Sequence, residues 1–344
     1  MTQDLLEVFQ SMDFSNKDDG ITLNDRVLII DGMNTFIRSF AAIPTMDENG
    51  NHIGGVTGFL KSVGYVIRKF KPSRVYVIFD GKGGSKRRRE IYPDYKSGRK
   101  PLTRLNRTYD MTTEQDEQDL MRYELVIVAK ALMKLPITTI TLDHVEADDI
   151  ISYIAQHVVE NGGESIIYST DKDFLQLVGD GIKVWNPVRK KTYIPETVLE
   201  DYSIHPNNFL LYRALTGDTS DNLPGIKGLG MKTLLKFMPG FATEEKLDLD
   251  GVITIAESSK SKVMSKIVDQ KETIQRNLIL MSLLSVMISD NNKMKILNKI
   301  NRPQLSLHKY DLTKLLIETN ILPSMQNYDS WVVSTFNSLT RFDG

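Results

Sequence analysis

The chain has 344 residues, of which 41% are apolar and 25% charged, and a formal net charge of −1, an ordinary composition for a globular protein long enough for two domains. It contains no cysteine, which excludes disulfides, thiolate zinc sites and a cysteine nucleophile. Its five histidines lie far apart without helical ligand spacing, so we expect any metal to be Mg²⁺ or Mn²⁺ held by oxygen ligands.

The first half of the chain alternates short apolar runs with amphipathic stretches, a pattern typical of a parallel sheet flanked by helices. Strands are predicted, in chain order, at RVLIID, RVYVIFD, ITTITL, SIIYST and IKVWN. Helices are predicted between them over residues 56–69, 114–134 and 146–160. The sequence therefore predicts an α/β fold with a central sheet of parallel type.

The second half lacks strand patterns from about residue 195 onward. Its segments have helical periodicity, including residues 262–288 and 308–321. We therefore predict an α/β core over residues 1–194, a second region over 195–250 and a helical C-terminal region over 251–344.

Charge is strongly segregated along the chain. Residues 82–107 carry ten Lys or Arg against only Glu90 and Asp94. Within this stretch, KGGSKRRREIYPDYKSGRK mixes cations with Tyr92 and Tyr95, which suits a single-stranded nucleic acid because cations meet phosphates and rings stack on bases. A solvated basic loop is the alternative. We predict that residues 82–113 form an insertion that contacts nucleic acid.

Carboxylates follow four of the predicted strands. The carboxyl ends of parallel strands meet at one edge of a sheet, so these side chains should gather there. Any one of them can be explained as a turn former or a helix cap, but their joint occurrence favours a shared site. Crowded carboxylates repel one another unless cations neutralise them, and this predicts two Mg²⁺ or Mn²⁺ ions. The predicted set is Asp31, Asp80, Glu146, Asp148, Asp149, Asp171, Asp173, Asp218 and Asp221.

A glycine-rich segment, NLPGIKGLGMKTLLK, follows the last of these acids. Gly225, Gly228 and Gly230 precede a predicted helix, as in a helix-hairpin-helix turn. Backbone N–H groups and a helix N-terminus there can contact a duplex phosphate without reading bases. Helix capping alone is the other interpretation.

No membrane segment is expected in this chain. The first residues, MTQDLLEVFQ, are acidic, and the longest apolar runs are too short to cross a bilayer. We therefore expect a cytoplasmic protein.

Five motifs together resemble the 5′-nuclease family, which includes flap endonucleases, the 5′→3′ exonuclease domains of bacterial repair polymerases and bacteriophage RNase H. They are IIDGMN, IFDGK, VEADD, STDKDFLQL and GDTSDNLPGIKGLGMKT, spread over roughly residues 25–240. VWNPVRKKTYIP and QRNLILMSLL resemble the bacteriophage RNase H branch most. The resemblance implies a PIN-like nuclease core with a helical arch and a helix-hairpin-helix element. It also implies a Mg²⁺-dependent 5′→3′ exonuclease and flap endonuclease that removes RNA primers during replication, in the bacterial host cytoplasm if phage-encoded.

The resemblance also assigns roles to residues. One ion, near the scissile phosphate, would be held by Asp80, Glu146, Asp148 and Asp171. The second would be surrounded by Asp173, Asp218 and Asp221, with Asp31 and Asp149 nearby. Asp80, Asp171, Lys96 and Arg99 form the expected catalytic set, the last two contacting the reacting phosphate. The expected nucleic-acid contacts are Arg88, Tyr92, Tyr95, Lys96, Arg99, Gly225, Lys227, Gly228, Gly230 and Lys232, and in relatives the hairpin also binds K⁺.

The expected substrates are branched or nicked duplex DNA and RNA–DNA hybrids, bound by a monomer. The amphipathic tail SWVVSTFNSLTRFDG suggests docking of residues 331–344 to a single-strand binding protein or a sliding clamp. Two alternatives remain open. They are a PIN-like single-strand ribonuclease and a DNA-junction-binding protein without catalysis.

Overall fold

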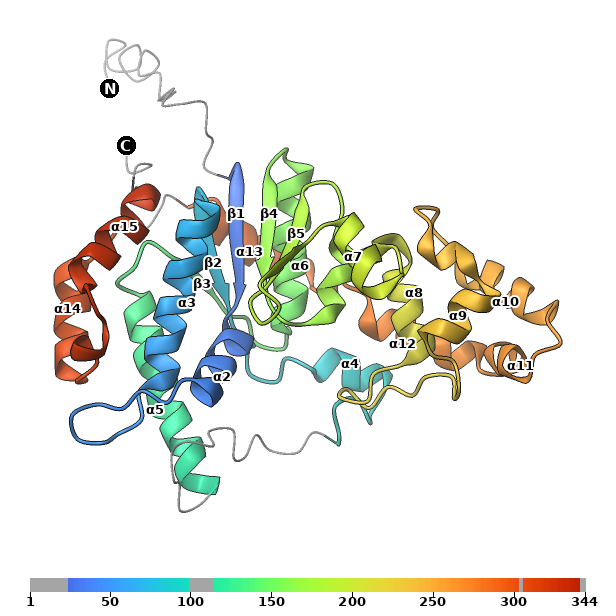
Figure 1. The fold of residues 1–344 in the computed structure, drawn as a ribbon, viewed down its shortest axis with the longest axis horizontal. Coiled ribbons are helices and arrows are strands. Elements are labelled where there is room, and N and C mark those ends of the chain that lie inside the picture. Colours follow the sequence, from blue (N-terminus) through green and yellow to red (C-terminus); the bar gives the residue numbers. More distant parts are fainter. Residues whose placement is uncertain (1–23, 99–113, 303–305, 341–344) are drawn as a thin grey trace, which may run out of the picture.

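The computed structural model describes residues 24–98, 114–302 and 306–340 (Figure 1). A six-stranded sheet in the order β3-β2-β1-β4-β5-β6 forms its centre. Every neighbouring pair is parallel except β5 and β6, which are antiparallel. The predicted α/β fold and its five strands are confirmed, and β6 is an additional strand. The strands are β1 (Arg26–Asp31), β2 (Arg74–Ile78), β3 (Thr138–Ile140), β4 (Glu164–Tyr168), β5 (Ile182–Asn186) and β6 (Lys191–Tyr193).

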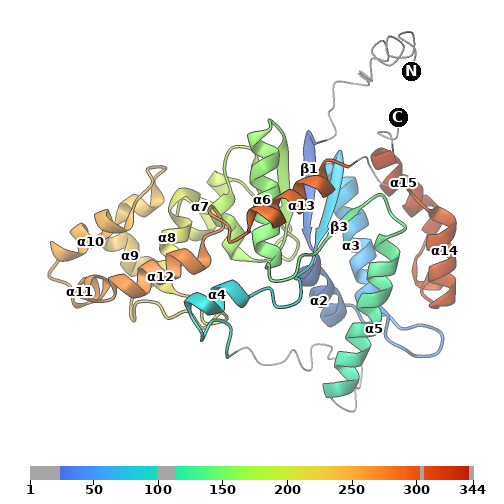
Figure 2. The ribbon, with the colours of Figure 1, turned by 180° about the vertical axis from the view of Figure 1, so that it is seen from behind.

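The sheet is covered by helices on both faces, as Figures 1 and 2 show. Val27 and Ile29 of β1 pack into the core on one face, and Leu28 and Ile30 pack into the core on the other. A strand buried on both faces has a continuous apolar sequence, which explains RVLIID. The first core includes α6 (Ala147–Glu160) and α8 (Pro206–Thr216). The second includes α2 (Gly32–Ala42), α3 (Gly54–Phe70), α5 (Glu114–Leu132), α14 (Lys309–Glu318) and α15 (Tyr328–Thr340).

The helical second half packs against the sheet rather than standing apart from it. Arg74 of β2 is buried and donates a hydrogen bond of 2.6 Å to the carbonyl oxygen of Ile300 at the end of α13. The first core contains residues from β1 and from helices as late in the chain as α13. The predicted domain boundaries at 195 and 251 stay a prediction. The remaining helices are α4 (Lys86–Ile91), α7 (Pro195–Tyr202), α9 (Met231–Phe237), α10 (Leu249–Glu257), α11 (Lys262–Asp269), α12 (Lys271–Met281) and α13 (Asp290–Ile300). Short 3-10 helices are η1 (Lys172–Leu177), η2 (Pro239–Ala242) and η3 (Leu322–Ser324).

The amphipathic tail has a structural role in α15. Val332, Phe336 and Leu339 are completely buried in the second core. These side chains pack within the chain, and docking of residues 331–344 to a single-strand binding protein or a sliding clamp stays a prediction. Among the described residues, no helix combines the length and apolar character needed to cross a bilayer.

Candidate active site

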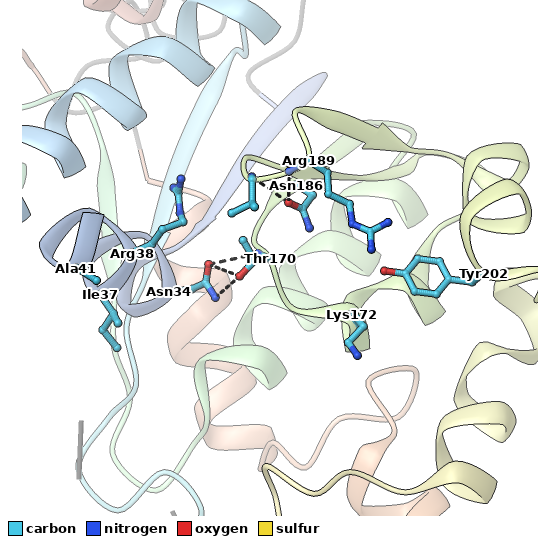
Figure 3. Close-up of a pocket in the computed structure, with 10 residues that line it drawn as sticks. Asn34, Ile37, Arg38, Ala41, Thr170, Lys172, Asn186, Arg189 and Tyr202 are labelled. Atoms are coloured by element: carbon cyan, nitrogen blue, oxygen red, sulfur yellow. Dashed lines mark hydrogen bonds between the residues drawn. The ribbon is translucent and has the colours of Figure 1, made fainter. Parts of the chain in front are cut away.

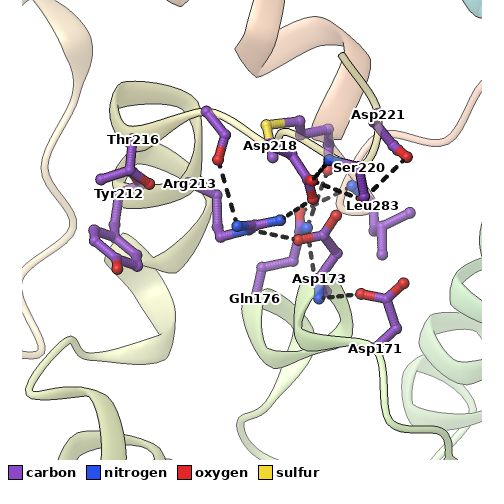
Figure 4. Close-up of polar contacts among 12 residues, drawn as sticks. Asp171, Asp173, Gln176, Tyr212, Arg213, Thr216, Asp218, Ser220, Asp221 and Leu283 are labelled. Carbon is purple, nitrogen blue, oxygen red and sulfur yellow. Dashed lines mark hydrogen bonds and ion pairs between the residues drawn. The ribbon is translucent and has the colours of Figure 1, made fainter. Parts of the chain in front are cut away.

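A small pocket beside the carboxyl ends of the central strands contains six of the nine predicted acids. They come from the start of α6, the segment after β4 and the loop after α8. Figure 4 shows four of them gathered around Arg213 and Ser220. Parallel strand ends meet at one edge of the sheet, which explains how residues so far apart in sequence converge here. The six are Glu146, Asp148, Asp171, Asp173, Asp218 and Asp221.

Asp31 and Asp80 support the same edge through capping bonds. Asp31 accepts hydrogen bonds of 3.0 Å from the backbone N–H of Asn34 and from the hydroxyl of Ser169. Asp80 accepts a 2.9 Å bond from the backbone N–H of Ala147, at the first residue of α6. Both acids therefore cap helices, as the simpler interpretation expected, and both also lie at the acidic edge.

Burial and the crowding of the carboxylates raise the pKa of several of them. Burial, with smaller contributions from the neighbouring Asp171 and Asp80, raises the pKa of Asp31 to about 7 against the opposing effect of its hydrogen bonds. Burial and then Asp171 raise the pKa of Asp173 to about 6. The pKa of Asp148 is raised for the same reasons, burial first and then Asp171 and Asp31. A bound cation would relieve this repulsion.

Basic side chains of the same chain form ion pairs with several carboxylates of the pocket. The ammonium of Lys96 lies 2.7 Å from Glu146 Oε1. Arg213 donates from Nε to Asp173 Oδ1 over 2.7 Å and also pairs with Asp218 (Figure 4). Although burial opposes it, Arg88 and Lys96 hold the pKa of Glu146 below its usual value.

Within the described ranges no three carboxylates are spaced to hold one ion as they stand. The expectation that only divalent cations could neutralise the cluster was therefore incomplete, because Lys96 and Arg213 also neutralise carboxylates in it. The donor set itself fits Mg²⁺, which prefers carboxylate oxygens.

Arg88 and Asp149 form a buried ion pair beside the acidic pocket. Arg88 is only 4% exposed, and its two terminal nitrogens lie 2.6 and 2.9 Å from the carboxylate oxygens of Asp149. Its Nε donates to the carbonyl oxygen of Leu280, and Nη1 lies 2.9 Å from Glu146. Arg88 was predicted to contact phosphate and Asp149 to lie near a metal. In the structure they connect α4 to α6 and α12, and both predicted roles stay predictions.

The two tyrosines of the basic stretch also differ from the prediction that they offer free rings to bases. Tyr95 is 3% exposed, and its hydroxyl lies 3.2 Å from Glu146 Oε2 and 3.1 Å from Asp221 Oδ2. The guanidinium of Arg276 lies over the Tyr92 ring, 4.0 Å from its centroid. Tyr95 therefore positions acids of the pocket. Arg99, the other predicted arch cation, lies outside the described residues.

The glycine-rich segment forms the loop between α8 and α9. A Cβ on Gly225 would lie 2.0 Å from the carbonyl oxygen of Thr216, so only glycine allows this close approach. Gly228 has φ +92°, in the region that favours glycine. Lys227 and Lys232 are exposed on the same segment. The local backbone thus explains two glycines, and the predicted duplex contact stays a prediction.

A second pocket, which the sequence reasoning missed, lies between α2 and the segments that follow β4 and β5 (Figure 3). It encloses about 620 Å³ and is lined by Arg38, Lys172 and Arg189, with no carboxylate among its lining residues. Lys172, which lines this pocket, stands in sequence between Asp171 and Asp173 of the acidic pocket. The VRKK sequence after β5 was the available signal for this basic surface.

Several known proteins are similar in sequence to this chain. Residues 26–203 match the family model described as the 5′-3′ exonuclease N-terminal resolvase-like domain. The 5′-3′ exonuclease of Aquifex aeolicus is 31% identical over 220 residues, covering 64% of this chain and 71% of that protein. DNA polymerase I of Thermus thermophilus is 32% identical over 253 residues, which are 73% of this chain and 28% of the polymerase.

Solved structures show the same fold. The bacteriophage T5 D15 flap endonuclease, in a pseudo-enzyme-product complex with DNA and metal ions, has a TM-score of 0.60 at 21% identity. The alignment covers 85% of this chain and 98% of that one. The T5 5′-exonuclease with zinc ions bound has a TM-score of 0.61 at 20% identity, covering 87% and 98% of the two chains.

The family model covers just over half of the chain, and the Aquifex aeolicus relative is similar over most of its own length. These two matches establish that the chain belongs to the 5′-3′ exonuclease family.

Proposed function

We propose that this chain is a Mg²⁺-dependent 5′→3′ exonuclease and flap endonuclease that hydrolyses phosphodiesters at the 5′ ends of RNA or DNA next to duplex. Hydrolysis would leave a 5′-phosphate on one product and a 3′-hydroxyl on the other. The observation that carries the proposal is the single pocket where six carboxylates from three separated segments meet the ammonium of Lys96.

The residues of the pocket divide into ligands and phosphate contacts. Two Mg²⁺ or Mn²⁺ ions would be held by the acids, and when bound they supply an activated water and stabilise the entering and leaving oxygens. The first would lie among Asp80, Glu146, Asp148 and Asp171, and the second among Asp173, Asp218 and Asp221. Lys96, once released from Glu146, carries a positive charge within the same pocket and would orient the phosphate and stabilise its developing charge.

Two further features support a substrate with a duplex part. The basic pocket around Arg38, Lys172 and Arg189 offers cations to phosphates beside the acidic pocket. The loop from Gly225 to Lys232 presents exposed lysines and backbone N–H groups, as a duplex-binding hairpin would. Removal of RNA primers, K⁺ binding at this loop and action as a monomer belong to the same proposal.

The experiment uses 5′-end-labelled flap duplexes, RNA-primed duplexes and unstructured RNA, each with and without Mg²⁺. We expect short labelled products from the first two substrates only when Mg²⁺ is present. Preferred cleavage of unstructured RNA would favour the single-strand ribonuclease instead. Tight binding of the flap duplex without any cleavage would favour a junction-binding protein.

A further inference from the structure

A third pocket, called the polar pocket below, lies on a different side of α4 from the acidic pocket. It encloses about 740 Å³ and is lined by Arg87 of α4, the turn after β3 and the first turns of α13. Both α4 and α13 are visible in the rear view (Figure 2). The nuclease roles above leave this pocket without a function. Its other polar lining residues are Thr141, Asp143, His144, Ser289, Asn291, Asn292 and Lys295.

The pocket has the chemistry of a site for an anionic backbone. Arg87 and Lys295 outnumber its one carboxylate, Asp143, which already accepts a hydrogen bond from the backbone N–H of Lys82. Lys295 is exposed and makes no ion pair with any described residue. The N-terminus of α13, an eleven-residue helix capped by Ser289, adds partial positive charge, and Asp290 in its first turn pairs with Lys293.

The lining residues indicate contacts to phosphate and sugar rather than to stacked bases. Asn291, Asn292 and Ser289 supply amide and hydroxyl groups, and the lining contains no Phe, Tyr or Trp. Such a surface holds a backbone without reading its sequence. The volume lies within the range of small-ligand sites, which fits a few nucleotides of one strand but not a duplex.

The position of α4 connects this pocket to the acidic one. Arg88 lines the acidic pocket, while its neighbour Arg87 lines the polar pocket and donates a 2.8 Å hydrogen bond to the carbonyl oxygen of Met287. Arg87 uses one of its five N–H donors in that bond. A strand that leaves the acidic pocket and passes α4 would therefore meet Arg87 next.

We propose that the polar pocket binds the phosphate backbone of the displaced 5′ single strand after that strand has passed the acidic pocket. This inference rests on the proposed nuclease function and names a new subsite for its substrate. The subsite makes long flaps bind more tightly than flaps too short to reach it, with Lys295 as a phosphate contact.

The test measures binding and cleavage of flap duplexes of increasing flap length by the full chain and its Lys295→Glu variant. Lys293→Glu is the matched control, because Lys293 lies on the same helix, pairs with Asp290 at 3.5 Å and does not line the pocket. For long flaps, Lys295→Glu should weaken binding about tenfold. Lys295→Ala should reduce the slope of log affinity against log salt by about 0.7, the value for one single-strand phosphate contact.

For a one-nucleotide flap, both Lys295 variants should bind and cleave as the unsubstituted chain does. Equal effects on short and long flaps, no effect on long flaps, or the same effect from Lys293→Glu would overturn the subsite. Failure of the nuclease proposal would look different, because the unsubstituted chain would then cleave neither substrate in Mg²⁺.

Discussion

Replacing Arg88 distinguishes two possible roles of its side chain. It either contacts a substrate phosphate or holds α4 against α6 and α12 through buried polar contacts. Its side chain is 4% exposed, and the side chains of its partners Asp149 and Glu146 are 2% and 5% exposed. Removing one partner of a buried ion pair costs about 3–5 kcal/mol, because the other charge is left without compensation. We therefore expect Arg88→Ala to lower the free energy of unfolding by about 3–5 kcal/mol in urea titrations followed by circular dichroism.

Arg89→Ala is the control, since Arg89 is exposed on the same helix and makes a single 3.2 Å bond to the carbonyl oxygen of Tyr95. It should cost about 1 kcal/mol or less. The double variant Arg88→Met with Asp149→Leu should recover part of the lost stability, because an apolar pair can replace a buried ion pair. If Arg88→Ala unfolds like Arg89→Ala while flap cleavage falls, Arg88 contacts phosphate and the structural role is refuted.

Three further substitutions test other parts of the molecule. Asp171→Asn should lower Mg²⁺-dependent cleavage by more than about a hundredfold, since even outer-shell changes cost 10–100-fold, while gel-shift affinity for duplex stays unchanged. Normal turnover would rule out its ligand role. Gly225→Ala should cost about 1–3 kcal/mol and weaken duplex binding, because its Cβ would meet Thr216, whereas Gly230→Ala, whose Cβ meets nothing within 4 Å, should do neither. Phe336→Ala should lower the free energy of unfolding by about 3–5 kcal/mol, and an unchanged urea midpoint would contradict the packing of α15.

The sheet was predictable because its central strands are buried on both faces and therefore read as apolar runs. The same rule explains two of the elements that the residue patterns did not predict. β6 is the three-residue KTY at the antiparallel edge, and α4 reads KRRREI, which looks like a solvated basic run. Only Arg88 of that helix is buried, and no periodic pattern marks it.

The acids of the site were predictable because a parallel sheet brings strand ends together. The ion pairs that these acids form with basic side chains of the chain were not predictable. Arg88 and Asp149 are 61 positions apart, and Arg213 and Asp173 are 40 apart, and each residue also fits a more common role in its own segment. Pairing across such distances depends on how α4 and α8 pack, which local sequence does not encode.

The central claim is that the acidic pocket binds divalent cations, and isothermal titration of Mg²⁺ into the full chain tests it most directly. Saturable binding of two ions is predicted, with weaker binding in Asp171→Asn and in Asp173→Asn while both variants remain folded. Binding that is absent, or that is the same in both variants as in the unsubstituted chain, would contradict the account.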